Sequence, residues 1–235
     1  MHDLMSFLQH IQWLAVGQII LIDILLGGDN AVVIALACRN LPEKQRWKGI
    51  IWGTLGAIIL RVVLVAFAVT LLQIPALKII GGALLFWIGI KLLLPQDDDE
   101  HGSMQAHTHL MGAIKTIIIA DLVMSIDNVI AIAGAAQTAA ADHQIYYVVF
   151  GLVVSIPFIV FGSQLILKLI DRFPIIVTLG AALLGFIAGE LMVTDPLTQP
   201  YFAEHLNAWK YSAGAAGAVL VVLMAKWLTP SQRPV

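Results

Sequence analysis

Asp23-Ile-Leu-Leu-Gly-Gly-Asp29-Asn30 and Asp121-Leu-Val-Met-Ser-Ile-Asp127-Asn128 are two copies of one pattern, D-x5-D-N, and each lies within a long apolar run. All three polar positions of the second copy follow those of the first by 98 residues, which indicates an internal repeat. A carboxylate at membrane depth costs about 2.5 to 3.5 kcal/mol on insertion scales. The four aspartates must therefore face a cavity, a partner or an ion.

The composition is that of a polytopic membrane protein. Of the 235 residues, 60% are hydrophobic and 12% are charged, and the mean hydropathy is +0.90. So few polar residues cannot cover a soluble surface of this size. The single cysteine, Cys38, excludes an internal disulfide and a cysteine-based zinc site. With a net charge of −2 and no long basic run, nothing indicates a nucleic-acid partner.

Seven apolar runs approach the length of about 20 residues that a transmembrane helix needs. We expect spans near residues 12–37, 49–72, 74–94, 112–136, 146–169, 174–194 and 207–229. Lys and Arg gather at one set of alternating ends of these spans. By the positive-inside rule, this predicts a multi-pass protein with its N-terminus outside the cell and its C-terminus in the cytoplasm.

The repeat extends beyond the acidic motif. Trp52-Gly53 matches Phe150-Gly151 at the same offset of 98, and residues 81–85 match residues 180–184 at an offset of 99. The repeating unit holds three spans, an odd number, so the second copy must enter the membrane from the opposite side. We therefore predict an all-α membrane protein of seven helices, a 3+3 inverted-topology repeat plus one C-terminal helix, with a site between the halves near the bilayer midplane.

This prediction divides the chain into four parts. Residues 1–94 form the first three-helix repeat, 95–111 a cytoplasmic polar linker, 112–194 the second repeat, and 195–235 the additional helix and tail. The linker carries an acidic run with a histidine at 97–101, followed by two more histidines at 107 and 109. A solvated, flexible connection is the favoured interpretation because acidic polar runs usually stay disordered. The alternative interpretation is a loop that delivers or senses a metal.

Two features decide how the acidic residues are presented. On a straight helix Asp23 and Asn30 share one face, with Asp29 about a third of a turn away. Gly27-Gly28 could unwind the helix and turn Asp29 toward the same cavity, whereas the second copy has Ser125-Ile126 at these positions.

Arg61 lies near the middle of the second span, so its charge must be paired. We expect a fixed ion pair with one of the aspartates, and the functional alternative is that Arg61 fills the site when no metal is bound.

The segments that carry the two motifs, residues 27–37 and 121–131, resemble those of the TerC family, in particular its short seven-helix branch, often labelled YjbE-type. The resemblance implies a metal transporter of the bacterial inner membrane, remotely related to the LysE superfamily of exporters, with manganese efflux as the favoured activity. The ion-binding positions that the resemblance implies are Asp23, Asp29, Asn30, Asp121, Asp127 and Asn128.

These six side chains offer only oxygen ligands. Such ligands suit manganese, magnesium or calcium and argue against copper or zinc. Manganese is preferred among the three only through the resemblance. A divalent cation that leaves a cell negative inside works against about 4.6 kcal/mol per 100 mV. The sequence has no G-x4-G-K-[ST] motif for a nucleotide, so proton antiport is the simplest coupling, and sodium could serve equally well.

Other classes of function compete with export. The main alternative is a membrane component of a metal or tellurite stress response that senses metal or acts as a scaffold without transporting it. Inert hydrogen bonding of the aspartates between helices is a further alternative. An intramembrane aspartyl protease is disfavoured because Leu26-Gly27-Gly28-Asp29 lacks the first glycine of G-x-G-D. We therefore expect no enzymatic activity and no catalytic cofactor, with the lipid bilayer, the divalent cation and a coupling proton as partners.

Overall fold

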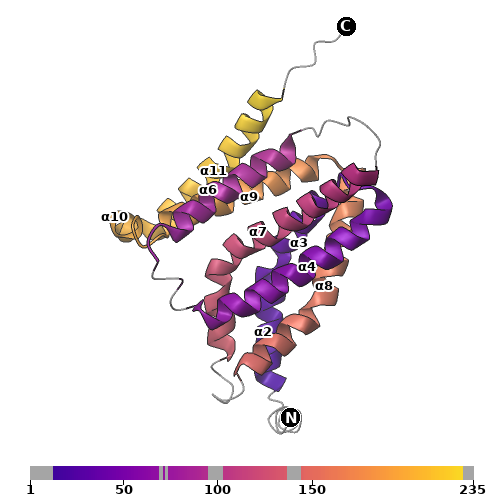
Figure 1. The fold of residues 1–235 in the computed structure, drawn as a ribbon. Helices are drawn as coiled ribbons and strands as arrows, with labels where there is room; N and C mark the ends of the chain where they lie inside the picture. The colour runs from indigo at the N-terminus through magenta and orange to yellow at the C-terminus, as the bar shows by residue number, and fades with distance from the viewer. Residues whose placement is uncertain (1–12, 69–70, 72–73, 95–102, 137–143, 230–235) are drawn as a thin grey trace.

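The computed structural model describes residues 13–68, 71, 74–94, 103–136 and 144–229 (Figure 1). Every regular element within these ranges is a helix. In chain order they are α2 (Trp13–Leu26), α3 (Gly28–Cys38), α4 (Glu43–Ala66), α6 (Leu77–Leu93), α7 (Ser103–Ala136), α8 (Gln144–Arg172), α9 (Ile175–Val193), α10 (Gln199–Phe202), the 3-10 turn η2 (Ala203–His205) and α11 (Leu206–Leu228). The acidic run at 97–101 lies outside the described residues, and α7 begins inside the predicted linker.

Five helical stretches in the described ranges are long and apolar enough to cross a membrane, and a bent pair, α2 with α3, makes a sixth. The five are α4, His109–Val129 of α7, Ile145–Arg172 of α8, α9, and Gln199–Leu228. The helix α6 has 17 residues, or about 26 Å at ~1.5 Å per residue, slightly less than the ~30 Å of a hydrocarbon core. The protein is thus an all-helical membrane protein with five to six candidate spans.

Most predicted spans coincide with helices. Residues 174–194 and 207–229 agree with α9 and α11 to within one residue at each end. Two helices differ more: α7 begins at Ser103, before the predicted start at residue 112, and α4 begins at Glu43 and ends at Ala66, whereas the apolar run predicts 49–72. The polar residues at 43–48 form the first turns of α4, but they precede the apolar run and so lie outside the predicted span.

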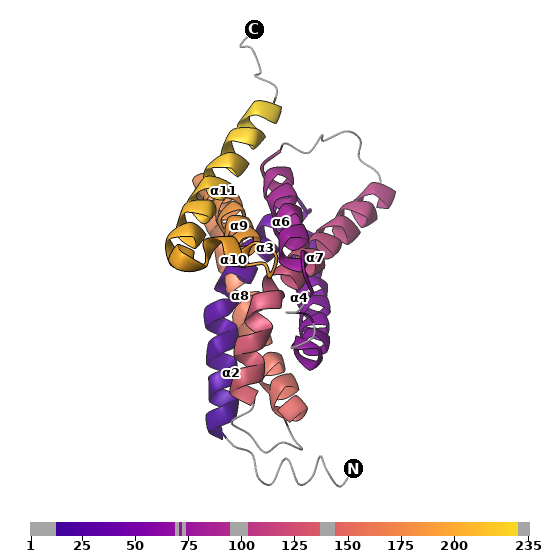
Figure 2. The same cartoon turned by 90° about the vertical axis from the view of Figure 1, so that its left-hand side faces the viewer.

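The first span is broken at Gly27, where Val16–Leu25 and α3 meet at an angle of 50°. A Cβ at Gly27 would lie 2.3 Å from the backbone carbonyl oxygen of Asp23, so only glycine fits this position. A Cβ at Gly28 would meet nothing within 4 Å. In the second half, α7 stays helical from Ser103 to Ala136, although it changes direction toward its C-terminal end (Figures 1 and 2).

The helices of the two halves pack across each other. The pair α2 and α3 lies against α8, α4 against α7, and α6 against α9. The last helix, α11, lies on α9 and α6, and the three run side by side next to the remaining bundle (Figures 1 and 2). A Cβ at Gly185 of α9 would lie 2.5 Å from the carbonyl oxygen of Gly217 of α11, so glycine lets these two backbones touch.

One pair of close contacts occurs in both halves. Gly53 of α4 packs against Ile117 of α7, and Gly151 of α8 packs against Ile19 of α2. A Cβ at either glycine would lie 2.5 Å from an isoleucine side-chain atom. Gly151 follows Gly53 by 98 residues, and Ile117 follows Ile19 by the same number. Equivalent residues therefore exchange partners, as in an isologous contact between two copies.

The crossing of α6 with α9 has the same reciprocity. A Cβ at Gly82 would lie 2.7 Å from the carbonyl oxygen of Ala188, and one at Gly89 would lie 3.3 Å from that of Ala181. Ala181 follows Gly82, and Ala188 follows Gly89, by 99 residues. The offset of 99 found in the sequence thus recurs in the packing of α6 on α9.

Two apolar clusters enclose the middle of the bundle. One contains Ile34, Ile117 and Val160, and the other contains Ile19, Ile132 and Leu152. Residues 23, 121 and 155 lie between these clusters along their helices. The polar groups at those positions are thereby shielded at both ends.

Candidate functional site

A buried arginine joins two equivalent aspartates. Arg61 of α4 donates from Nη1 to Asp23 of α2 and from Nη2 to Asp121 of α7. The three side chains are 2%, 0% and 6% exposed, respectively. Because these side chains are almost fully shielded from bulk solvent, each charge depends on this arrangement for compensation. The predicted ion pair of Arg61 is present, and it engages two aspartates instead of one.

Two serines complete the hydrogen bonding of this cluster. Ser125 Oγ accepts from Nε of Arg61 at 3.0 Å and donates to Oδ2 of Asp121 at 3.2 Å. Ser155 of α8 donates to Oδ2 of Asp23. Both oxygens of each carboxylate are thus engaged. Neither serine is among the predicted site residues. Ser125 lies one helical turn after Asp121, a spacing that could have found it, whereas Ser155 reaches Asp23 only through the packing of α8 on α2.

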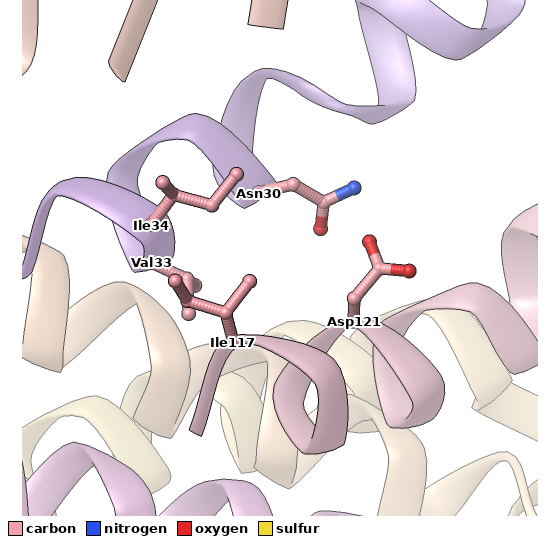
Figure 3. A pocket seen from close by; sticks show the side chains of 5 residues that line it. All are labelled: Asn30, Val33, Ile34, Ile117 and Asp121. Carbon is pink, nitrogen blue, oxygen red and sulfur yellow. The ribbon is translucent and has the colours of Figure 1, made fainter. Parts of the chain in front are cut away.

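Asn30 of α3 faces a small cavity with an unpaired amide. Its side chain is 3% exposed, and within the part of the chain that the structure describes neither Oδ1 nor Nδ2 has a hydrogen-bond partner. The cavity has a volume of about 10 Å³, room for about one water molecule. It is lined by Asn30, Val33, Ile34, Ile117 and Asp121. Figure 3 shows the amide of Asn30 and the carboxylate of Asp121 turned toward each other.

An unpaired buried amide costs about 1 to 3 kcal/mol. A polar ligand in the cavity would recover this cost. With both carboxylates ionised, the cluster of Asp23, Asp121 and Arg61 carries one net negative charge. A cation is therefore the ligand that the charge favours beside Asn30 and Asp121.

Asp29 lies in the first turn of α3, where its Oδ1 accepts the backbone N–H of Asn30 at 2.8 Å. The carboxylate is half-buried, and its position at a helix N-terminus favours negative charge. Its hydrogen bond ties it to its own helix.

Asp127 lies apart from the cluster around Arg61. Its carboxylate forms an ion pair with Lys78 of α6, in which Oδ1 lies 2.5 Å from Nζ. The side chain of Asp127 is 46% exposed. Asn128, the next residue, is half-buried. The structure therefore brings Asp23, Asp121 and Asn30 to the buried centre and leaves Asp127 nearer the end of α7. In the described ranges, no three His, Cys, Asp or Glu side chains are arranged to hold a metal ion. The six-ligand set stays a prediction.

The chain is similar in sequence to known membrane proteins. The model of the integral membrane protein TerC family matches residues 8–233. The membrane protein YjbE of Bacillus subtilis (strain 168) is 45% identical over 184 residues, which cover 78% of this chain and 81% of that one. The inner membrane protein YgdQ of Escherichia coli (strain K12) is 26% identical over 197 residues, 77% of this chain and 81% of that one. No solved structure matches the chain.

Proposed function

Because the chain belongs to the TerC family of integral membrane proteins, we propose that it is a secondary transporter that exports a divalent metal cation, with Mn²⁺ as the favoured substrate, in exchange for protons. One observation carries the proposal: the unpaired Asn30 amide shares a small cavity with Asp121, a carboxyl of the buried cluster that also holds Asp23 and Arg61. Such a centre in a bilayer-embedded protein is expected to be functional.

The proposed architecture is seven spans, with α6 as the short one, in two inverted repeats of three helices followed by α11. The reciprocal contacts of Gly53 with Ile117 and of Gly151 with Ile19 support it. They bring equivalent residues together across the centre of the bundle, where inverted-repeat transporters bind their substrates. We place the protein in the bacterial inner membrane with its N-terminus outside and its C-terminus in the cytoplasm. The relative YgdQ of Escherichia coli is named as an inner membrane protein, which supports this location.

In this proposal Arg61 stands in for the substrate. Its guanidinium holds one oxygen of Asp23 and one of Asp121, which are hard oxygen ligands of the kind that Mn²⁺ prefers. A divalent cation that enters beside Asn30 displaces the guanidinium and gathers the proposed ligands, which are Asp23, Asp29, Asn30, Asp121, Asp127 and Asn128. The break at Gly27 lets the start of α3 move toward such an ion without unwinding a continuous helix.

Proton exchange explains how export proceeds against the membrane potential. Moving a dication outward alone costs about 4.6 kcal/mol per 100 mV. If two protons enter for each dication that leaves, no net charge crosses and this cost vanishes. The carboxylates that release the metal are the groups that take up the protons, since metal and proton compete for the same oxygens.

The test is Mn²⁺ flux in proteoliposomes under an imposed pH gradient. We expect flux that follows the gradient and is lost in Asp121→Asn. Binding of Mn²⁺ by the purified protein without any flux would instead favour the alternative, a metal-sensing or scaffold component of a stress response. The full pairing of Asp23, Asp121 and Arg61 is the observation compatible with that alternative, because a paired cluster also serves a static role.

A further inference from the structure

The pair Lys78 and Asp127 lies between the buried centre and the C-terminal end of α7. Asp127 follows Asp121 by six residues, or about 9 Å along the helix. The Nζ of Lys78 lies 2.5 Å from Oδ1 of Asp127, and the lysine side chain is only 12% exposed. A predicted cation ligand is thus already occupied by a cation of the protein itself.

Asp195 fixes the position from which Lys78 reaches Asp127. This aspartate follows α9, is fully buried, and accepts the backbone N–H groups of Ala76 at 3.0 Å, Lys78 at 3.0 Å and Ile79 at 3.4 Å. These donors are the free N–H groups at the start of α6. Lys78 is therefore presented from a capped helix start, unlike a lysine in an ordinary surface pair, whose side chain is free to move.

The ion pair also joins two groups of helices. Lys78 belongs to α6, which packs mainly on α9 and α11, whereas Asp127 belongs to α7, which packs mainly on α4, α2 and α3 (Figure 2). The helices α6 and α7 also touch directly, since a Cβ at Gly81 would lie 2.7 Å from the Val123 side chain. A cation that binds Asp127 must displace Lys78 and so release this charged contact, while the apolar packing of α6 on α7 remains. The equivalent residue in the first copy of the acidic pattern, Asp29, accepts a backbone N–H instead. The ion pair with a lysine therefore distinguishes the second copy from the first.

We propose that Lys78 is a tethered cation that occupies Asp127 until a transported cation replaces it, and that it closes the route between the centre and the C-terminal end of α7. This inference rests on the proposed transport of a divalent cation. Arg61 and Lys78 then act at two depths as built-in substitutes for the substrate. Lys78 is a positioning residue in this scheme, since it acts through Asp127.

The experiment measures access to the centre and does not depend on transport. Ser125→Cys in a Cys38→Ala background places one thiol on α7 between Asp121 and Asp127, and a membrane-impermeant thiol reagent reports its accessibility. We expect Lys78→Gln and Asp127→Asn each to raise the modification rate about tenfold. Lys78→Arg should keep the modification rate of the parent, which is the protein with Ser125→Cys and Cys38→Ala alone. Lys210→Gln is the matched control, since Lys210 lies 4.0 Å from Glu190 in another pair, on α11, and should change nothing.

Mn²⁺ supplies the second arm. Added to the parent, it should raise the modification rate because it competes with Lys78, and in Asp127→Asn it should have no effect. Equal rates in the parent and Lys78→Gln would overturn the inference even if the protein transports Mn²⁺. Absence of Mn²⁺ flux in the wild-type protein would refute the proposed transport. Raised labelling in Lys78→Gln, with the rate of the parent in Lys78→Arg, would still support the closure. If Lys78→Gln does not reach the membrane, Lys78→Met keeps the apolar stem and takes its place.

Discussion

Asp23 and Asp121 bind the same guanidinium group, although 98 residues separate them in the chain. They occupy equivalent positions in the two copies of the acidic pattern. Arg61 has no charged counterpart, because the equivalent residue is Ile159, which is buried in an apolar cluster with Ile34 and Ile117. Two acids related by the repeat are therefore held by one cation that the repeat does not duplicate.

Removing that cation is expected to destabilise the protein strongly. Arg61→Ala leaves two buried carboxylates without compensation, which costs about 3 to 5 kcal/mol. Thermal unfolding in detergent measures the loss. Asp171→Asn is the control, because Asp171 pairs with Arg46 at 3.0 Å but is 53% exposed, and exposed pairs contribute about 0 to 1 kcal/mol. An Arg61→Ala protein as stable as the wild type would contradict the assigned role of Arg61.

A metal ion should partly replace the missing guanidinium. Mn²⁺ is expected to raise the unfolding temperature of Arg61→Ala more than that of the wild type, because Asp23 and Asp121 are then free to bind it. Adding Asp121→Asn to this variant should remove the extra stabilisation. Equal shifts in the wild type and in both variants would mean that the metal binds elsewhere.

The two neighbouring glycines at the helix break should respond differently to alanine. Gly27→Ala introduces a Cβ 2.3 Å from the Asp23 carbonyl oxygen, so the break must rearrange and Asp23 must shift. We expect a loss of stability of about 1 to 3 kcal/mol and a loss of Mn²⁺ flux. Gly28→Ala meets no atom within 4 Å and should behave like the wild type. Equal stability and equal Mn²⁺ flux in both variants would show that the close approach at Gly27 is not needed for function.

Asn30 is expected to be retained for function at the expense of stability. Asn30→Leu removes an unpaired buried amide that costs about 1 to 3 kcal/mol, and the new side chain faces Val33, Ile34 and Ile117. The free energy of unfolding should therefore stay the same or rise, while Mn²⁺ flux is lost. A marked destabilisation, measured by thermal unfolding, would instead show that the amide of Asn30 contributes a native contact.

The contribution of Asp195 should depend on pH in a defined direction. Burial raises the pKa of this carboxyl, but hydrogen bonds from the backbone N–H groups of Leu197, Ala76, Ile79 and Lys78 outweigh burial and hold the pKa below its ordinary value of 3.8. Its stabilisation is then complete above pH 3.8 and is lost as the pH falls through the lowered pKa of the folded state. The difference in unfolding temperature between wild type and Asp195→Asn should be constant from pH 7 to about 5 and shrink below pH 3.8. A difference that shrinks near neutral pH would contradict this.

Local sequence patterns determined the class of the protein and many of its elements. Composition and apolar runs indicated a membrane protein, and the helices α9 and α11 follow the predicted spans to within one residue. The family resemblance is confirmed. Gly27-Gly28 indicated a break where the 50° bend occurs, and the charge of Arg61 required a partner. Each of these depends on residues near one another in the chain, or on the high cost of a bare charge in lipid.

Tertiary structure alone decided which groups meet. Arg61 takes both Asp23 and Asp121, Ser155 of α8 reaches Asp23, and Lys78 occupies Asp127. Hydropathy and spacing give the face of one helix, but the partner across the interface depends on how far each helix is rotated and shifted against its neighbour. Close glycine contacts such as Gly53 with Ile117 set those rotations. For that reason the sequence contained the charged groups of the centre, and only the packing of the helices determined their pairing.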